Sequence, residues 1–170
     1  DTRPLFGKRI LVTRARAQAS ALSALLAAAG AVPVETPVIR QETLPPAAHL
    51  LARLRGADWL VFTSANGLPA LLEQVAARGG DIRALGGAQI AAIGPATAES
   101  VRRHHLHVAY QAERFVAESL AEGFPAPAGK RIVIARAADA RDVLPDTLRA
   151  RGADVEIVPV YRTVAETGEA

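Results

Sequence analysis

The chain has 170 residues, of which half are apolar and 4% aromatic, with no Cys and a formal net charge of +3. The lack of Cys excludes disulfides, thiolate zinc sites and a cysteine nucleophile. No apolar run approaches the roughly 20 residues that span a bilayer, and Asp1-Thr2-Arg3-Pro4 does not resemble a signal peptide. We therefore predict a cytoplasmic protein without membrane contact, and the scattered Arg residues make nucleic acid an unexpected partner.

The N-terminal residues predict a strand, a helix and a second strand. Residues 10–13 are a short aliphatic run, and residues 20–29 are helix formers that stop at Gly30. A strand from Val32 to Ile39 is expected next. Its two prolines cannot donate to a sheet ladder, so it belongs at an edge or in a connector. We assign residues 1–6 to a linker and 7–38 to a βαβ piece of a first lobe.

The central residues alternate between predicted strands and helices, which is typical of a parallel sheet covered on both faces. The strands are expected at 59–62, 89–93 and 107–109, and the helices at 67–78, 96–105 and 115–121. The predicted fold class is α/β, with a doubly wound, flavodoxin-like lobe over residues 39–161. This lobe includes the strands that connect it to the first lobe.

An internal repeat relates the two ends of the chain. Gly7–Arg14 matches Gly129–Arg136 at an offset of 122 residues, and matches continue in that register to Arg40 and Arg162. The second copy predicts a strand at 132–135, a helix ending before Gly152 and a strand at 155–161. The alternative is two ordinary βαβ units of similar composition. If the repeat is real, residues 162–170 begin a return into the first lobe, and its remainder is expected after Ala170.

Three turns after strands are candidate binding sites, at residues 62–67, 93–98 and 135–141, because ligands of open α/β sheets bind beyond the carboxyl ends of strands. The first turn offers Thr63, Ser64 and Ala65, although Ser64 could simply be a helix N-cap. The second offers Gly94, Ala96 and Thr97, where free backbone N–H groups at a helix start can hold an anion. The alternative is that Gly94-Pro95 only ends the strand and begins the helix, without a role in binding.

Arginine, tyrosine and histidine supply the other candidates. In the third turn, Arg136 follows a strand and matches Arg14 in the repeat, and a guanidinium suits a carboxylate ligand. Arg141, in the same loop, is interpreted as a solvated side chain. Tyr161 either donates a hydrogen bond or closes the core. His104, His105 and His107 do not share a face, and neither a metal-ligand spacing nor a nucleotide-binding motif is present.

Five segments together resemble the uroporphyrinogen-III synthase family, from residue 7 to about residue 165. They are Val12-Thr13-Arg14 with Gln18-Ala19, Asp58 to Gly67, Ile93 to Ala98, Arg141 to Pro145, and Val160 to Thr163. The resemblance implies two α/β lobes joined by a two-stranded connector, with no metal and no cofactor. It also implies that the substrate is hydroxymethylbilane, whose eight carboxylates lie in a cleft.

The resemblance implies roles for particular residues. The family's catalytic tyrosine candidate falls on Tyr161, and its cleft-lining positions fall on Thr63, Ser64 and Thr97. Residues 2–8 resemble the junction to a fused uroporphyrinogen-III C-methyltransferase, which is therefore an expected partner domain. The family's second set of strand-to-helix turns has no counterpart in the sequence. A non-catalytic tetrapyrrole-binding module and a phosphosugar-binding domain are the alternative functions.

Overall fold

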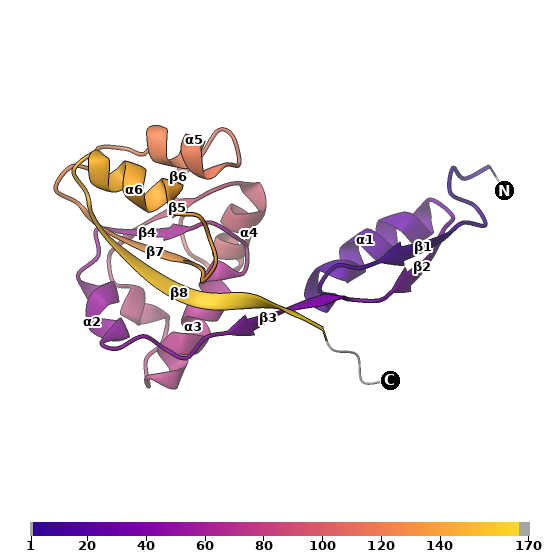
Figure 1. Cartoon of the computed structure of the whole chain (residues 1–170), viewed down its shortest axis with the longest axis horizontal. Coiled ribbons are helices and arrows are strands. Elements are labelled where there is room, and N and C mark those ends of the chain that lie inside the picture. Colours follow the sequence, from indigo (N-terminus) through magenta and orange to yellow (C-terminus); the bar gives the residue numbers. More distant parts are fainter. Residues whose placement is uncertain (1, 167–170) are drawn as a thin grey trace. The chain divides into compact units, whose positions relative to one another are not determined.

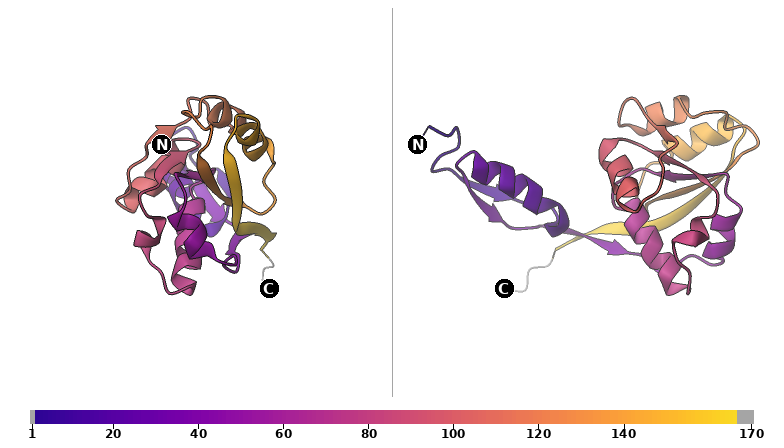
Figure 2. Two further views of the ribbon diagram at one scale, coloured as in Figure 1. Left: turned by 90° about the vertical axis from the view of Figure 1, so that its left-hand side faces the viewer. Right: turned by 180° about the vertical axis from the view of Figure 1, so that it is seen from behind.

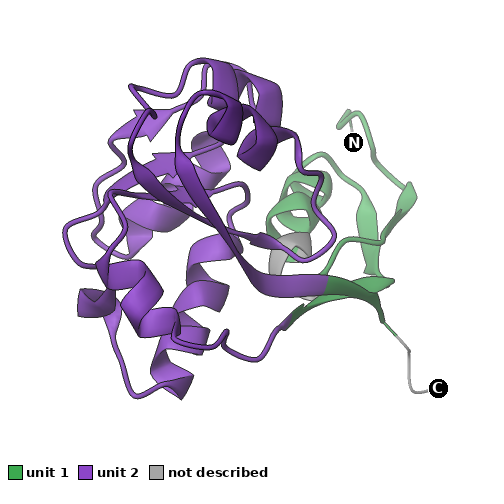
Figure 3. Ribbon diagram, turned by 60° about the vertical axis from the view of Figure 1, so that its left-hand side comes forward, with its two compact units in different colours: residues 1–42, 163–170 green, residues 43–162 purple. Residues whose placement is uncertain are grey.

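The computed structural model describes residues 2–166, with the side chains of residues 16–19 excepted. The chain divides into two compact units (Figure 3), which are residues 1–42 with 163–170, and residues 43–162. Within the described residues, none of the helices combines the length and apolarity needed to cross a membrane. Residues 167–170, which belong to the predicted return segment, lie outside the described residues.

The first unit contains β1 (Arg9–Val12), α1 (Arg16–Ala28), β2 (Val32–Glu35) and most of β3 (Ile39–Thr43). Strands β1 and β2 pair in parallel as a two-stranded sheet. The predicted strand Val32–Ile39 is wrong as a single element, because the chain leaves the sheet between β2 and β3. Pro37 lies in this break, where it has no N–H to continue a ladder.

The second unit is built around strands β8, β7, β4, β5 and β6 of a six-stranded sheet, whose full order is β3-β8-β7-β4-β5-β6. Strands β8, β7, β4, β5 and β6 are parallel to one another. At the edge, Leu44 N donates to Val160 O, and Glu166 N donates to Val38 O, so β3 runs antiparallel to β8. The remaining elements are α2 (Leu50–Arg55), β4 (Trp59–Phe62), α3 (Gly67–Ala77), the 3₁₀ helix η1 (Ile82–Leu85), β5 (Gln89–Ala92), α4 (Pro95–Arg103), β6 (Tyr110–Gln111), α5 (Ala117–Glu122), β7 (Arg131–Ala137), α6 (Val143–Ala150) and β8 (Asp154–Ala165).

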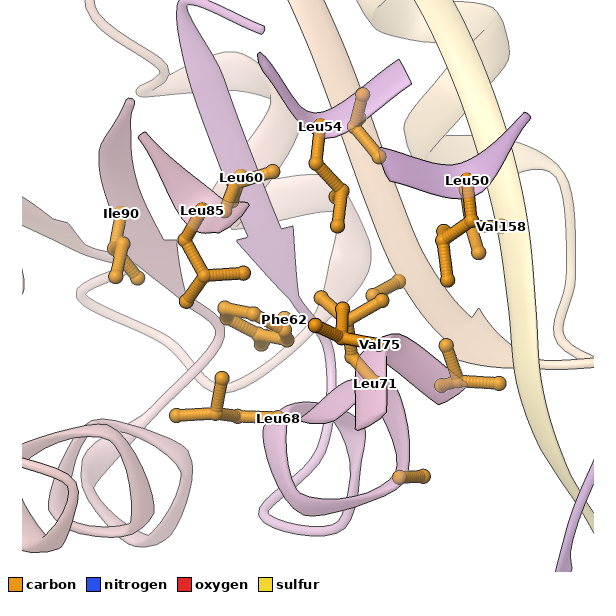
Figure 4. Packing of buried hydrophobic residues seen from close by; sticks show 14 of the residues in the cluster. Leu50, Leu54, Leu60, Phe62, Leu68, Leu71, Val75, Leu85, Ile90 and Val158 are labelled. Carbon is orange, nitrogen blue, oxygen red and sulfur yellow. The ribbon is translucent and has the colours of Figure 1, made fainter. Parts of the chain in front are cut away.

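Helices cover both faces of this sheet, which confirms the predicted doubly wound α/β fold (Figures 1 and 2). One core cluster joins the sheet to α2, α3, η1 and α4, and the other joins it to α5 and α6. Successive residues of a strand point to opposite faces. In β4, accordingly, Leu60 and Phe62 enter the first cluster, and Trp59 and Val61 enter the second. Figure 4 shows the first cluster at close range.

The repeat predicted from the sequence is present as two βαβ copies in one register. Arg9 pairs with Val32 in the first copy, and Arg131 pairs with Asp154 in the second, with both members shifted by 122 residues. The helices end at equivalent glycines, Gly30 and Gly152, both with positive φ. The helix at α2 was not predicted, and the short strand expected at 107–109 lies instead at Tyr110–Gln111.

Candidate functional site

The sheet has a topological switch point between its two central strands, β4 and β7. From β4 the chain proceeds through β5 and β6 toward one edge, whereas from β7 it proceeds to β8 on the other side. Helix α3 follows β4 on one face and α6 follows β7 on the other. The two connections therefore diverge above the carboxyl ends of these strands, where ligands of such folds bind.

A pocket of about 200 Å³ opens at this switch point. Phe62 and Ala135 are partners in the β4–β7 ladder. Thr63 directly follows the end of β4, and Arg136 is the residue after Ala135 within β7. The structure thus brings together two candidate residues that are far apart in sequence. The pocket is lined by Thr63, Ala117, Arg136, Ala140, Arg141 and Leu144.

Ser64 and Tyr161 meet at the same end of the sheet. The Ser64 Oγ and Tyr161 Oη atoms lie 2.8 Å apart, and either hydroxyl can be the donor. Tyr161 is 7% exposed. Its ring therefore packs in the core, whereas its hydroxyl takes part in a hydrogen bond. The N-cap alternative for Ser64 is wrong, because α3 begins after Asn66 and no side chain caps it.

A β-bulge directs Tyr161 toward Ser64. Arg136 pairs with Pro159, but the next residue, Ala137, pairs with Tyr161, which leaves Val160 as an extra residue in β8. The bulge interrupts the alternation of the strand, so Val160 and Tyr161 are both buried in the same cluster. Bulges commonly redirect side chains near functional sites. Gln74 fixes this strand from α3 by donating to Pro159 O at 3.1 Å.

The turn after β5 leads into the N-terminus of α4 at the same end of the sheet. Gly94 is the N-cap of α4, Pro95 is its first residue, and no side chain caps this end. The N–H groups of Ala96 and Thr97 have no partner within the helix, because they belong to its first turn. Thr97 is 4% exposed and Ala96 is exposed. This turn therefore offers backbone amides more than the Thr97 hydroxyl.

Two residues near these turns were missed by the sequence interpretation. Phe115 is 62% exposed and packs over Gly94, where an added Cβ would lie 2.9 Å from its ring. Ser100 of α4 donates to Ala65 O at 2.7 Å, so it joins the first turn to the helix that follows the second. The signal for Phe115 was its rarity, as the chain has only four Phe, together with its place at the predicted start of the helix 115–121.

Arg136 is 7% exposed, and two of its nitrogens bind the loop that follows it. Its Nη1 donates to Arg141 O at 2.7 Å, and its Nη2 contacts the Asp142 carboxylate. Arg14 lies in the first unit, just after β1, and is exposed. Among residues 2–166, no three His, Cys, Asp or Glu side chains come together as a metal site requires.

The fold is a doubly wound α/β lobe, and these turns form a candidate ligand site at its switch point. Solved structures with this fold include a uroporphyrinogen III synthase of Thermus thermophilus, with a TM-score of 0.70 and 23% identity over 94% of this chain and 64% of that chain. The uroporphyrinogen-III synthetase of Helicobacter pylori 26695 has a TM-score of 0.62 and 18% identity over 95% of this chain and 63% of that chain.

Sequence comparison identifies the family. Residues 20–170 match the profile of uroporphyrinogen-III synthase HemD, and the chain therefore belongs to that family. It is 36% identical to the uroporphyrinogen-III synthase of Synechococcus elongatus over 94% of this chain and 62% of the relative. It is 31% identical to the porphyrin biosynthesis protein HemD of Ruminiclostridium josui over 95% of this chain and 33% of the relative. The chain thus spans less than two thirds of either relative.

Proposed function

We propose that this chain contributes the tyrosine-bearing lobe of a uroporphyrinogen-III synthase. The reaction would cyclise hydroxymethylbilane with inversion of its terminal ring and loss of water. Family membership supports the reaction type. The observation that carries the proposal is the Tyr161–Ser64 hydroxyl pair, 2.8 Å apart, at the end of the sheet where the first amides of α4 have no side-chain cap and no partner within the helix.

In the proposed reaction, the Tyr161 phenol acts at the bond that breaks first. It donates its proton to the hydroxyl of the hydroxymethyl group, which leaves as water and generates a cationic, N-protonated azafulvene beside the phenolate. Ser64 can donate to the resulting phenolate, because its Oγ already lies within hydrogen-bond distance. The proton released from the pyrrole carbon that closes the ring then restores the phenol. One molecule of water is lost overall, and no oxidant or reductant is needed.

The harder task in this reaction is steering, because the azafulvene also closes without an enzyme to the symmetric isomer. The terminal ring must be attacked at its substituted carbon, giving a spiro intermediate that fragments and recloses with the ring inverted. Positioning alone can supply much of such a preference. In our proposal, the amides of α4 and the polar groups around Thr63 hold substrate carboxylates, and exposed Phe115 offers an apolar contact to a pyrrole ring.

Isomer analysis of the product from hydroxymethylbilane tests this proposal, using a protein of full family length. We expect the type III isomer from the parent protein. We expect about a 100-fold lower kcat from Tyr161→Phe, because proton transfer by a positioned side chain contributes roughly that factor. Tyr110→Phe changes the only other tyrosine and is the matched control, with unchanged kcat expected.

Two results would contradict the proposal. If Tyr161→Phe behaves like Tyr110→Phe, the phenol has only a packing role. If the parent protein binds the substrate but yields only the symmetric isomer, it is a binding module and not a synthase. The cytoplasmic location and the fused methyltransferase remain predictions from the sequence.

A further inference from the structure

The pocket at the switch point has the chemistry of a site for a short aliphatic carboxylate. Three of its lining side chains, Ala117, Ala140 and Leu144, are apolar and can contact methylene groups. Thr63 adds a hydroxyl donor, and the arginines add guanidinium groups. Its volume of about 200 Å³ suits one acetate or propionate side chain and excludes a whole pyrrole macrocycle.

Arg136 is not the cation that this pocket presents to a ligand. Its Nη1 and Nη2 are engaged with Arg141 O and the Asp142 carboxylate, and its Nε is buried from solvent without a partner. A ligand carboxylate therefore cannot reach Nε without moving the surrounding side chains. These contacts instead fix the backbone of the loop at Arg141 and Asp142.

Arg141 is the accessible cation. Its side chain is 73% exposed and lines the pocket, and its Nη2 lies 3.5 Å from Oε1 of Glu118. A guanidinium has five N–H donors, so this one contact leaves donors that can bind a carboxylate. Glu118 is 42% exposed and carries the same charge as the expected ligand, so it competes with the ligand for Arg141.

We propose that Arg141 and Thr63 bind one acetate or propionate carboxylate of the tetrapyrrole, and that Arg136 is a positioning residue that holds Arg141 in place. This inference rests on the proposed function for the class of ligand. It assigns to Arg141 the contact that the sequence interpretation gave to Arg136. It also gives Glu118 a defined role, because its carboxylate weakens ligand binding until the ligand displaces it.

Binding of uroporphyrin, an octacarboxylate, to the 170-residue chain tests this inference by fluorescence titration. We expect Arg141→Gln to raise Kd about tenfold, because a charge-assisted hydrogen bond is lost. Thr63→Val should raise Kd by a smaller factor. Glu118→Gln should lower Kd, since the competing carboxylate is gone. The Arg141 effect should shrink at high salt, because exposed charges are screened.

The ion pair Asp81–Arg83 provides a matched control at the opposite end of the sheet, where η1 precedes β5. Hydrogen bonds from the Arg83 side chain and backbone lower the pKa of Asp81 from 3.8 to about 2, so Asp81 is charged at neutral pH. Arg83→Gln and Asp81→Asn therefore make the same charge changes as Arg141→Gln and Glu118→Gln. Both control variants should leave Kd unchanged.

The inference fails if Arg141→Gln and Arg83→Gln have equal effects, or if Glu118→Gln does not lower Kd. That failure is distinct from failure of the proposed function, which is judged by the isomer formed. If the protein forms the type III isomer but its Kd does not change in Arg141→Gln, it is a synthase without this subsite. Arg136→Gln provides a further readout, because it should weaken binding only when Arg141 is present. If its effect persists in an Arg141→Gln background, Arg136 does not act through Arg141.

Discussion

The two βαβ copies of this chain share a register but differ in burial. Leu11 and Val133 occupy equivalent positions in β1 and β7, yet Leu11 is 60% exposed and Val133 is fully buried. Strand β7 lies between β4 and β8, whereas within residues 2–166 β1 pairs only with β2. The βαβ motif and its register therefore follow from local sequence, but burial depends on which strands lie beside the motif.

The helices of the two copies provide the largest test of this comparison. Leu148 of α6 is fully buried, whereas Leu25 of α1, which neighbours Leu26, the equivalent of Leu148 in the repeat, is 71% exposed. We expect Leu148→Ala to lower the free energy of unfolding by about 3 kcal/mol through transfer and cavity effects. Leu25→Ala should change it by less than about 0.5 kcal/mol. Urea unfolding measures both losses. Circular dichroism follows either variant, and the fluorescence of Trp59, the only Trp of the chain, follows unfolding of the second unit. Equal losses would mean that α1 is as well packed as α6.

The glycines after the two helices provide an intermediate test. Both have positive φ, +97° at Gly30 and +86° at Gly152, so alanine at either costs roughly 1–2 kcal/mol in backbone strain. At Gly30 an added Cβ would also lie 3.0 Å from backbone atoms of Phe6, so Gly30→Ala should cost more. Gly87→Ala is the control, because its Cβ would meet nothing within 4 Å. Thermal unfolding should rank the three variants in that order, and a harmless Gly152→Ala would contradict the strain argument.

The hydroxyl pair provides the smallest test of the comparison. Tyr161 corresponds in the repeat to Ile39, so the first copy has no phenol at this position. We expect Tyr161→Phe and Ser64→Ala each to reduce stability by about 1 kcal/mol, the net worth of one hydrogen bond. Because they share that bond, the double variant should lose less than the sum. A double-mutant cycle by urea unfolding measures this coupling, and strictly additive losses would show that the bond contributes nothing to stability.

Elements with a buried apolar run were predictable, and elements set by tertiary contacts were not. Strand Trp59–Phe62 was predicted with its observed bounds, because four consecutive buried residues specify a central strand. The six-residue helix α2 was missed, since a short segment carries little periodicity. In the region 32–43, the sequence revealed the prolines but not which sheet each strand would join.

The candidate site was predictable as a set of turns but not as a set of contacts. The predicted strands located Thr63, Gly94 and Arg136 at strand carboxyl ends, and in a parallel sheet these ends lie on one side. The Ser64–Tyr161 contact joins residues 97 positions apart, and it depends on a bulge for which the sequence shows no local signal. The internal contacts of Arg136 were equally hidden, because burial of a charged side chain depends on its neighbours. The roles of these residues remain predictions.

The antiparallel pairing of β3 and β8 affects the order in which the two units can fold during synthesis. Residues 43–162 form one continuous stretch, and the Leu44 N to Val160 O bond joins its two ends. The first unit is discontinuous, since it needs both residues 1–42 and the residues from Thr163 onward. Domains generally fold as units during synthesis. The nascent chain can therefore complete its second unit while the first, although it emerges earlier, still awaits the segment that bonds Glu166 to Val38. During that interval, exposed apolar side chains of β1 and α1 such as Leu11 and Leu25 lack the neighbours that would complete the first unit.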